Sequence, residues 1–183
     1  MKWIIRGLFA FMTLFGAAMV AGYFVNPALT VERSAPVTAA PSVVFPYLND
    51  IGKLQSWSPY YLRDIEAQVI FSGPEAGVGA EAAWDSAQGG IGFQTIIDSA
   101  PDRFVRTKLN IGGREGFGTY AIEPVDEDEA GSIVLVIIEG DMGGFPYIQR
   151  VFKPFYRKGF EGEIEQSLDI LSALIARDPD AQE

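Results

Sequence analysis

The chain has 183 residues, and 48% of them are hydrophobic, which predicts one domain with a well-filled core plus a short appendage. It contains no cysteine and no histidine. Disulfides, thiolate nucleophiles, cysteine metal sites and the serine–histidine triad are therefore excluded. Any enzyme built on this chain must use carboxylate, tyrosine, lysine, arginine or serine groups.

The charge is distributed unevenly along the chain. The net charge is −10, all 24 acidic residues follow residue 31, and Lys2 and Arg6 are the two of the 14 basic residues that precede it. The rest of the chain therefore carries 12 basic and 24 acidic groups. Such an acidic domain binds phosphate backbones poorly, so we predict no nucleic-acid partner and attribute the excess charge to solubility.

Residues 7–25 contain no charged side chain and predict a membrane-spanning helix. As a helix they would extend roughly 28 Å, about the thickness of the hydrocarbon layer of a bilayer. The segment is longer than a signal-peptide core, and residues 19–21 form a poor cleavage site, so an uncleaved anchor over residues 1–28 is favoured over a removed signal peptide.

The charges that flank this segment predict its orientation. Lys2 and Arg6 lie before it, and no comparable positive charge follows it directly. The positive-inside rule therefore predicts a single-pass membrane protein with a cytoplasmic N-terminus and an exported domain, which is the periplasmic side in a bacterium.

The next segments predict one strand and two short helices. Residues 29–39 are typical of a strand, and a helix is expected from Pro41, since proline suits a first helical turn. Pro46 predicts a break there or a very short helix. A helical turn and a loop are expected over residues 51–61.

A series of strand-like segments follows, each ended by turn residues such as Gly-Pro, Gly-Gly or Pro-Asp. Short turns between consecutive strands favour an antiparallel meander over βαβ units. The segments are residues 65–73, 79–86, 92–100, 103–111, 115–124 and 132–140.

Residues 145–176 predict a long C-terminal helix with a broad apolar stripe. Pro154, Gly159 and Gly162 lie inside the pattern and predict a kink or a break near them. Residues 178–183 are expected to form a flexible tail, which leaves residues 29–177 as the folded domain. The apolar stripe comprises Phe145, Ile148, Phe152, Phe155, Phe160, Ile164, Leu168, Leu171 and Ile175.

These elements predict an α+β helix-grip fold. A curved antiparallel sheet of about seven strands would close around the long C-terminal helix. Two short helices would follow the first strand, and the transmembrane helix would precede it.

The sequence resembles the START/Bet v1-like (SRPBCC) superfamily, in its polyketide cyclase/dehydrase and lipid-transport branch. The resemblance covers about residues 31–176 and rests on the order and spacing of several segments. It implies a hydrophobic cavity between the sheet and the long helix, where members bind lipids, quinones, sterols or polyketides and a minority catalyse a reaction. The segments are VERSAPVTAAPSVVFPYLNDIGKLQSWSPYY, SGPEAGVGAEAAWDS, PDRFVRTKLNI, GFGTYAIEP, IEGDM and KGFEGEIEQSLDILSALI.

The glycine-rich stretch over residues 73–86 suggests a phosphate loop, but its chemistry does not fit one. It lacks the spacing of a nucleotide-binding fingerprint and leads into a strand. Strand alternation places Ala82 and Trp84 on the inward face and Asp85 outward. Trp84 is therefore expected either to line the cavity or to pack as a core aromatic, and no catalytic residue is predicted here.

Tyr120 and Ile122 share the inward face of their strand, where the tyrosine hydroxyl would orient the polar end of a ligand or bond the backbone of a filled core. No cofactor is predicted, and the acidic run at residues 126–129 lacks the ligand spacing of a calcium loop, so no metal is predicted. The expected cavity residues are Ala82, Trp84, Tyr120, Ile122, Val136, Ile138, Phe145, Ile148, Phe152 and Phe155.

Four basic residues lie among aromatics at the start of the long helix. Arg150, Lys153, Arg157 and Lys158 form either a solvated helix face or a contact with anionic lipid headgroups.

The leading functional hypothesis is a membrane-anchored module that binds a hydrophobic small molecule, either a lipid or an isoprenoid-like compound. The alternatives are a polyketide cyclase- or dehydratase-like enzyme using carboxylate, tyrosine and arginine chemistry, and an interaction domain with a filled core. A carboxylate buried against Tyr120 would favour the enzyme, and an interior without a cavity would favour the interaction domain.

Overall fold

The computed structural model describes residues 2–59, 67–87, 90–126, 129–144 and 146–178. In these ranges the helices are α1 (Lys2–Phe24), α2 (Pro41–Asn49), α3 (Ile51–Trp57), α5 (Ile148–Val151) and α6 (Lys153–Arg177). The strands are β1 (Ala28–Val37), β2 (Gln68–Ser72), β3 (Glu81–Ser86), β4 (Gly90–Ala100), β5 (Phe104–Ile111), β6 (Arg114–Asp126) and β7 (Glu129–Asp141).

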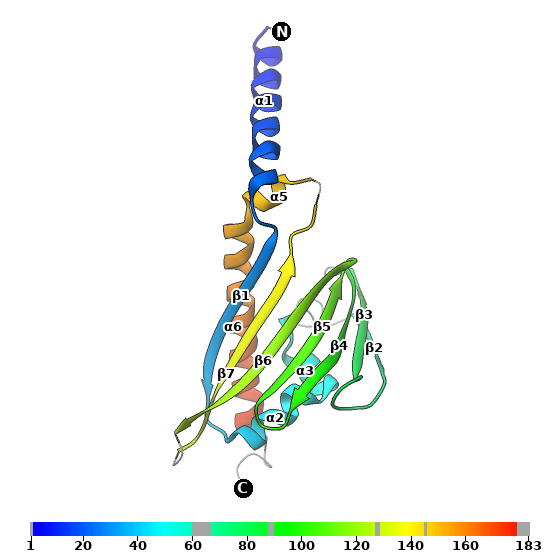
Figure 1. Ribbon diagram of the computed structural model, residues 1–183, viewed down its shortest axis with the longest axis vertical. Helices are drawn as coiled ribbons and strands as arrows, with labels where there is room; N and C mark the ends of the chain where they lie inside the picture. Colours follow the sequence, from blue (N-terminus) through cyan, green and yellow to red (C-terminus); the bar gives the residue numbers. More distant parts are fainter. Residues whose placement is uncertain (1, 60–66, 88–89, 127–128, 145, 179–183) are drawn as a thin grey trace.

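The strands form one antiparallel sheet in the order β1-β7-β6-β5-β4-β3-β2, which confirms the predicted fold class. The consecutive strands β2 to β7 form a meander, and β1 pairs with β7. Figure 1 shows the sheet curving around α2, α3 and α6, which all lie on the same face. The main core fills the space between that face and the three helices.

Helix α2 has nine residues and runs through Pro46, so of the two expected outcomes the short helix is present and the break is not. A proline removes one backbone donor, and here the buried side chains of Val44, Tyr47 and Leu48 hold the nine-residue helix against the core. Asp50 then caps α3, because its Oδ1 accepts hydrogen bonds from the backbone N–H groups of Gly52 and Lys53 at 2.8 and 3.0 Å.

The predicted interruption of the C-terminal helix falls before Pro154. Helix α5 ends at Val151, Phe152 leaves the helical conformation, and Pro154 occupies the first turn of α6. Gly159 and Gly162 lie within α6 without breaking it. Both glycines are exposed, and the 25-residue helix is stabilised by its buried residues from Ile164 onward.

The two halves of α6 have different surroundings. From Ile164 onward the helix packs against β1, α2 and α3, and its buried residues are Ile164, Ser167, Leu168, Leu171 and Ile175. Arg33 of β1 pairs with Glu161 at 2.6 Å and with Glu165 at 2.7 Å and so fixes this part of α6 to the sheet. Residues 154–159, in the first half of α6, are all exposed.

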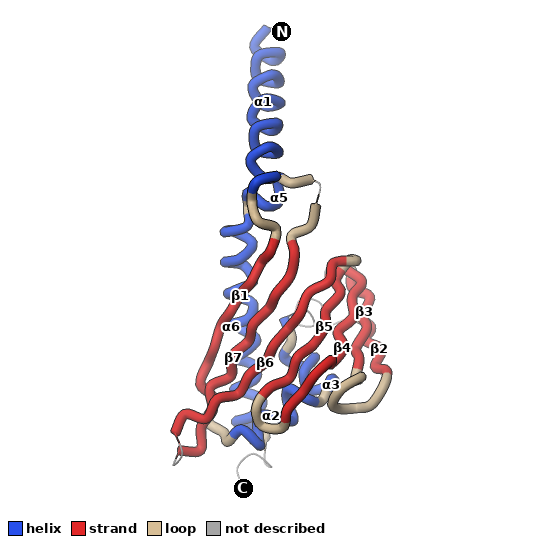
Figure 2. The backbone as a smooth tube through the Cα atoms, viewed as in Figure 1, coloured by secondary structure: helices blue, strands red, loops and turns tan. Residues whose placement is uncertain are grey.

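Helix α1 projects away from the domain along the long axis of the molecule (Figure 2). Its contact with the domain lies at its last turn, where Gly22 is buried against α5. A Cβ atom on Gly22 would lie 2.1 Å from the carbonyl oxygen of Tyr147, so this approach requires glycine. The rings of Tyr23 and Tyr147 meet edge to face at 5.4 Å.

Candidate ligand pocket

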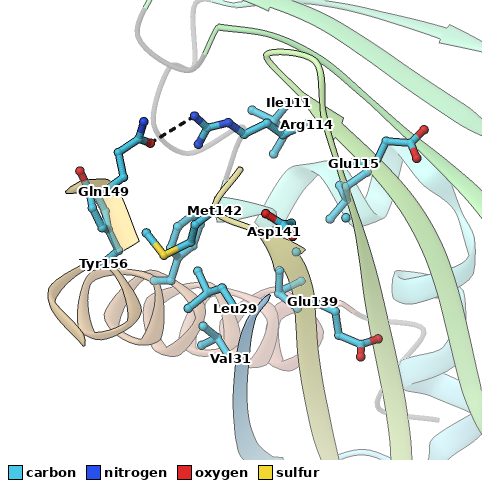
Figure 3. A pocket seen from close by; sticks show the side chains of 15 residues that line it. Leu29, Val31, Ile111, Arg114, Glu115, Glu139, Asp141, Met142, Gln149 and Tyr156 are labelled. Carbon is cyan, nitrogen blue, oxygen red and sulfur yellow. Dashed lines mark hydrogen bonds between the residues drawn. The ribbon is translucent and has the colours of Figure 1, made fainter. Parts of the chain in front are cut away.

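A pocket of about 340 Å³ lies between the end of the sheet nearest α1 and the segment that contains α5 and the start of α6. Figure 3 shows it from close by. The strands β1, β5, β6 and β7 form one wall, and the helices form the other. The lining residues are Leu29, Val31, Leu109, Ile111, Arg114, Glu115, Gly116, Ile138, Glu139, Gly140, Asp141, Met142, Gln149, Tyr156 and Phe160.

The walls are apolar because strand alternation turns Leu29 and Val31 of β1 and Leu109 and Ile111 of β5 toward the helices. Two facing glycines keep the sheet side of the pocket open. Gly116 of β6 pairs directly with Gly140 of β7, so no side chain fills this part of the wall. A Cβ on Gly116 would lie 2.7 Å from a backbone oxygen, which excludes larger residues without a shift of the strand.

The polar groups gather at the rim. Nη2 of Arg114 donates to Oε1 of Gln149 at 3.2 Å, which connects the start of β6 with α5 (Figure 3). The carboxylates of Glu115 and Glu139 point away from the pocket and pair with Lys108 at 2.6 Å and Arg106 at 3.8 Å. The site therefore combines apolar walls with a few polar groups, as small-molecule sites commonly do.

A separate polar cluster is buried deeper in the core. Nε2 of Gln94 donates to the hydroxyl of Tyr120 at 3.1 Å and to Oγ1 of Thr107 at 3.0 Å, and Oε1 of Gln94 accepts from Nε2 of Gln55 at 2.7 Å. Burial raises the pKa of Tyr120 above its ordinary value, against the opposing effect of these hydrogen bonds. The hydroxyl is therefore neutral and held in place.

Tyr120 was expected to orient a ligand, but its hydroxyl accepts a hydrogen bond from Gln94 and the residue does not line the 340 Å³ pocket. Tyr120, Val136 and Ile138 line a second void of about 10 Å³, room for one water at most. Among the described residues the buried polar side chains are amides and hydroxyls, and no carboxylate is buried against Tyr120. In the same ranges no three carboxylates are grouped so that they could hold a metal ion, and Glu127 and Asp128 lie outside them.

The strand residues expected to form the cavity are distributed over three places. Ile138 lines the pocket, whereas Ala82 and Ile122 belong to the main core, together with Tyr120 and Val136. Trp84 packs with Leu109, which does line the pocket, so its indole lies one layer behind the wall.

The helical residues of the expected set lie elsewhere. Ile148 is half-buried on α5, and Phe152 and Phe155 are 53% and 78% exposed on the outer surface. Phe145 lies outside the described residues. The helical part of the wall is supplied instead by Gln149, Tyr156 and Phe160.

The four basic residues divide into two pairs. Arg150 donates to the carbonyl oxygen of Gly143 at 2.7 and 3.0 Å and to that of Val25 at 3.4 Å. Lys153 donates to the carbonyl oxygens of Asn26 and Ala28. These two therefore hold the chain that leaves α1, while Arg157 and Lys158 are exposed on α6.

Sequence reasoning missed most of the wall because it selected the middles of the strands, and the pocket lies at their ends. Two features of the sequence do indicate parts of this wall. The alternation that places Val31 inward also places Leu29 inward, and Gly116 marks a strand position without a side chain. Gln149 and Arg114 are brought together only by the tertiary structure, and no local sequence pattern indicates that they are neighbours.

A curved antiparallel sheet around a long helix, with an apolar pocket between them, defines a helix-grip ligand-binding protein. Residues 28–176 match the family described as polyketide cyclase/dehydrase and lipid transport, and the chain belongs to this family. The family assignment and the fold confirm the resemblance to the START/Bet v1-like superfamily. None of the curated proteins matches the chain at a significant level.

Solved structures share the fold at low sequence identity. A protein from Chromobacterium violaceum is 17% identical with a TM-score of 0.58, over 82% of this chain and 99% of its own. Norcoclaurine synthase from Thalictrum flavum, solved with dopamine and hydroxybenzaldehyde, is 12% identical with a TM-score of 0.59, over 81% of this chain and 87% of its own. A protein from Mesorhizobium loti is 15% identical with a TM-score of 0.56, over 81% and 97%.

Proposed function

We propose that this protein is a membrane-anchored module that binds a hydrophobic small molecule, a lipid or an isoprenoid-like compound, between its sheet and its C-terminal helix. The observation that carries the proposal is the pocket of about 340 Å³ with apolar walls. Its volume lies at the lower end of the range of roughly 300–1,000 Å³ that is usual for small-molecule sites.

The anchor is α1. Its 23 residues have a mean hydropathy of 1.9 in their most apolar window, and the helix is long enough to cross a bilayer. Lys2 and Arg6 lie in its first two turns, before the uncharged part, so we propose that the N-terminus is cytoplasmic and that the domain is exported. The pocket then lies beside the membrane, because Leu29 follows α1 by a few residues and lines the pocket.

A matched pair of tryptophan substitutions tests the proposal. Ile111→Trp adds bulk inside the pocket, while Ile91→Trp adds the same bulk at a side chain that is 68% exposed and does not line it. We expect native mass spectrometry of the full chain, released from detergent, to show a bound apolar molecule in the wild type and in Ile91→Trp. Occupancy in Ile111→Trp should fall by at least about tenfold, the equivalent of ~1.4 kcal/mol in binding free energy. Equal occupancy in both variants, or an empty wild type, would contradict the proposal.

A further inference from the structure

An exposed apolar surface lies at the junction of α5 and α6. It consists of Val151, Phe152, Phe155 and Tyr156, whose exposed fractions are 40%, 53%, 78% and 45%. We call it the α5–α6 shoulder. A cluster of large exposed apolar residues, two of them phenylalanines, marks an interaction surface more often than a solvated one.

The position of the shoulder relative to α1 identifies what covers it. A helix of 23 residues extends roughly 34 Å, so a membrane-spanning α1 would carry its last turn to the edge of the hydrocarbon layer. Gly22, in that last turn, is packed directly against Tyr147, just before α5. The start of the shoulder therefore lies at the level of the last turn of α1 (Figure 1), where a membrane-spanning α1 would leave the bilayer.

The charges around the shoulder fit the same level. Arg150 and Lys153 bond the backbone that connects α1 to β1, which keeps the shoulder next to the membrane exit. Arg157, which pairs with Glu161 at 3.0 Å, and Lys158 are exposed and directly follow Phe155 and Tyr156 in α6, in a chain whose net charge is −10. Aromatic rings are favoured at the interface between water and hydrocarbon, and basic side chains are attracted to anionic headgroups.

The shoulder is continuous with the pocket. Tyr156 belongs to it and also lines the pocket, and Gln149, just before the shoulder, forms the rim with Arg114. Whatever covers the shoulder therefore also faces the rim of the pocket.

We propose that the α5–α6 shoulder is a membrane-docking surface, which enters the interfacial layer of the bilayer that holds α1 and sets the rim of the pocket against the lipid. The pocket would then exchange its ligand with the bilayer without passing it through water. This inference rests on the membrane anchoring in the proposed function.

Site-specific depth measurements test the inference on the full chain. Because the sequence has no cysteine, one introduced cysteine gives one nitroxide label. We choose Ala10→Cys within α1, Val151→Cys in the shoulder and Ala173→Cys on the exposed side of α6, 18 residues after Phe155 and so roughly 27 Å along the helix. The protein is reconstituted in vesicles of phosphatidylcholine and phosphatidylglycerol, and the collision rates of each label with oxygen and with a water-soluble nickel chelate are compared.

We expect a deep label at Ala10, an interfacial label at Val151 and an aqueous label at Ala173. In the Val151→Cys background, Phe152→Ser with Phe155→Ser should move the label toward water. The matched pair Ile91→Ser with Ile97→Ser, which removes exposed apolar residues elsewhere, should leave it in place.

Two results would overturn the inference, and they differ in whether they also reject the proposed membrane anchoring. An aqueous label at Val151 with a deep label at Ala10 rejects the docking surface and leaves the anchored ligand-binding module intact. An aqueous label at Ala10 rejects both the docking surface and the membrane anchoring.

Discussion

The packing of Trp84 depends on one neighbouring glycine. Trp84 and Gly92 are paired across β3 and β4, and the indole occupies the space that a side chain at Gly92 would need. A Cβ on Gly92 would lie 2.5 Å from the indole ring and 2.9 Å from the carbonyl oxygen of Asn110. Trp84 supports the pocket wall through Leu109, so this contact links core packing to the shape of the site.

Gly92→Ala is therefore expected to lower the free energy of unfolding by about 1–3 kcal/mol, the usual cost of overpacking a filled core. Gly140→Ala is the matched control, because a Cβ at this other strand glycine would meet nothing within 4 Å. Urea unfolding of the full chain in detergent measures both variants. Equal stability of the two would contradict the packing described for Trp84.

Tyr120 predicts a pH dependence of stability. Its ordinary pKa is 10.0, and burial raises the pKa in the folded state. Below pH 10.0 both folded and unfolded chains hold the proton, so the contribution of the neutral buried hydroxyl is fully present. As the pH rises above this value the unfolded chain ionises first, and the contribution is lost as the pH passes through the raised pKa of the folded state.

Tyr120→Phe should cost about 0.5–1.5 kcal/mol at neutral pH, because one hydrogen bond to Gln94 is removed. Its stability should fall less than that of the wild type between about pH 8 and about pH 11, because the wild type begins to lose the contribution of the buried hydroxyl once the pH exceeds the ordinary pKa of tyrosine. Urea unfolding at the two pH values checks this. Parallel losses in both proteins would contradict the assignment.

The residues that face inward could be predicted from alternation, but their roles could not. Ala82, Trp84 and Tyr120 are buried as expected. The partners of Tyr120 and Trp84, which are Gln94 and Gly92, come from other strands, and no local pattern indicates which residue lies opposite. Whether a region of the interior is filled or open depends on the volumes of all the side chains that meet there in three dimensions. The hydrophobic periodicity of the sequence gives no information on those volumes.

At the level of elements, the contact between α1 and α5 fixes where the pocket lies relative to the proposed membrane anchor. Gly22 makes the closest approach in this contact, whereas Gly16 has nothing within 4 Å of its added Cβ. Comparing substitutions at Gly22 and at Gly16 therefore separates the packing role of Gly22 from the general effect of replacing a glycine in an apolar helix.

Gly22→Val is expected to separate α1 from α5, because the new Cβ would overlap the carbonyl oxygen of Tyr147. Amide hydrogen exchange at residues 147–151 should then rise by about tenfold or more, which corresponds to ~1.4 kcal/mol of lost local stability. Gly16→Val should leave the exchange unchanged. An effect of equal size in both variants would show that the contact is not specific.

The order and type of the elements could largely be predicted from the sequence, because each strand is bounded by turn residues and the last helix has a clear stripe. The exceptions have physical reasons. Pro46 does not break α2, since buried neighbours hold that helix. The apolar stripe does not indicate where α6 leaves the sheet, so Phe152 and Phe155 look like core residues in sequence and are exposed in the fold.

At the level of the whole molecule, three features lie close together: the last turn of α1, the α5–α6 shoulder and the rim of the pocket. A soluble carrier has no need to place its pocket beside an apolar helix. The arrangement supports the proposal that the protein is anchored by α1 and takes an apolar ligand from the bilayer.

Photo-crosslinking in vesicles tests this central claim most directly. The full chain is reconstituted with a fatty acid that carries a photoactivatable diazirine, and the crosslinked peptides are identified by mass spectrometry. We predict labelling of residues 138–142 or 156–160 in addition to α1, with loss of the pocket label in Ile111→Trp and retention in Ile91→Trp. Labelling confined to α1, or pocket labelling that Ile111→Trp leaves unchanged, would contradict the account.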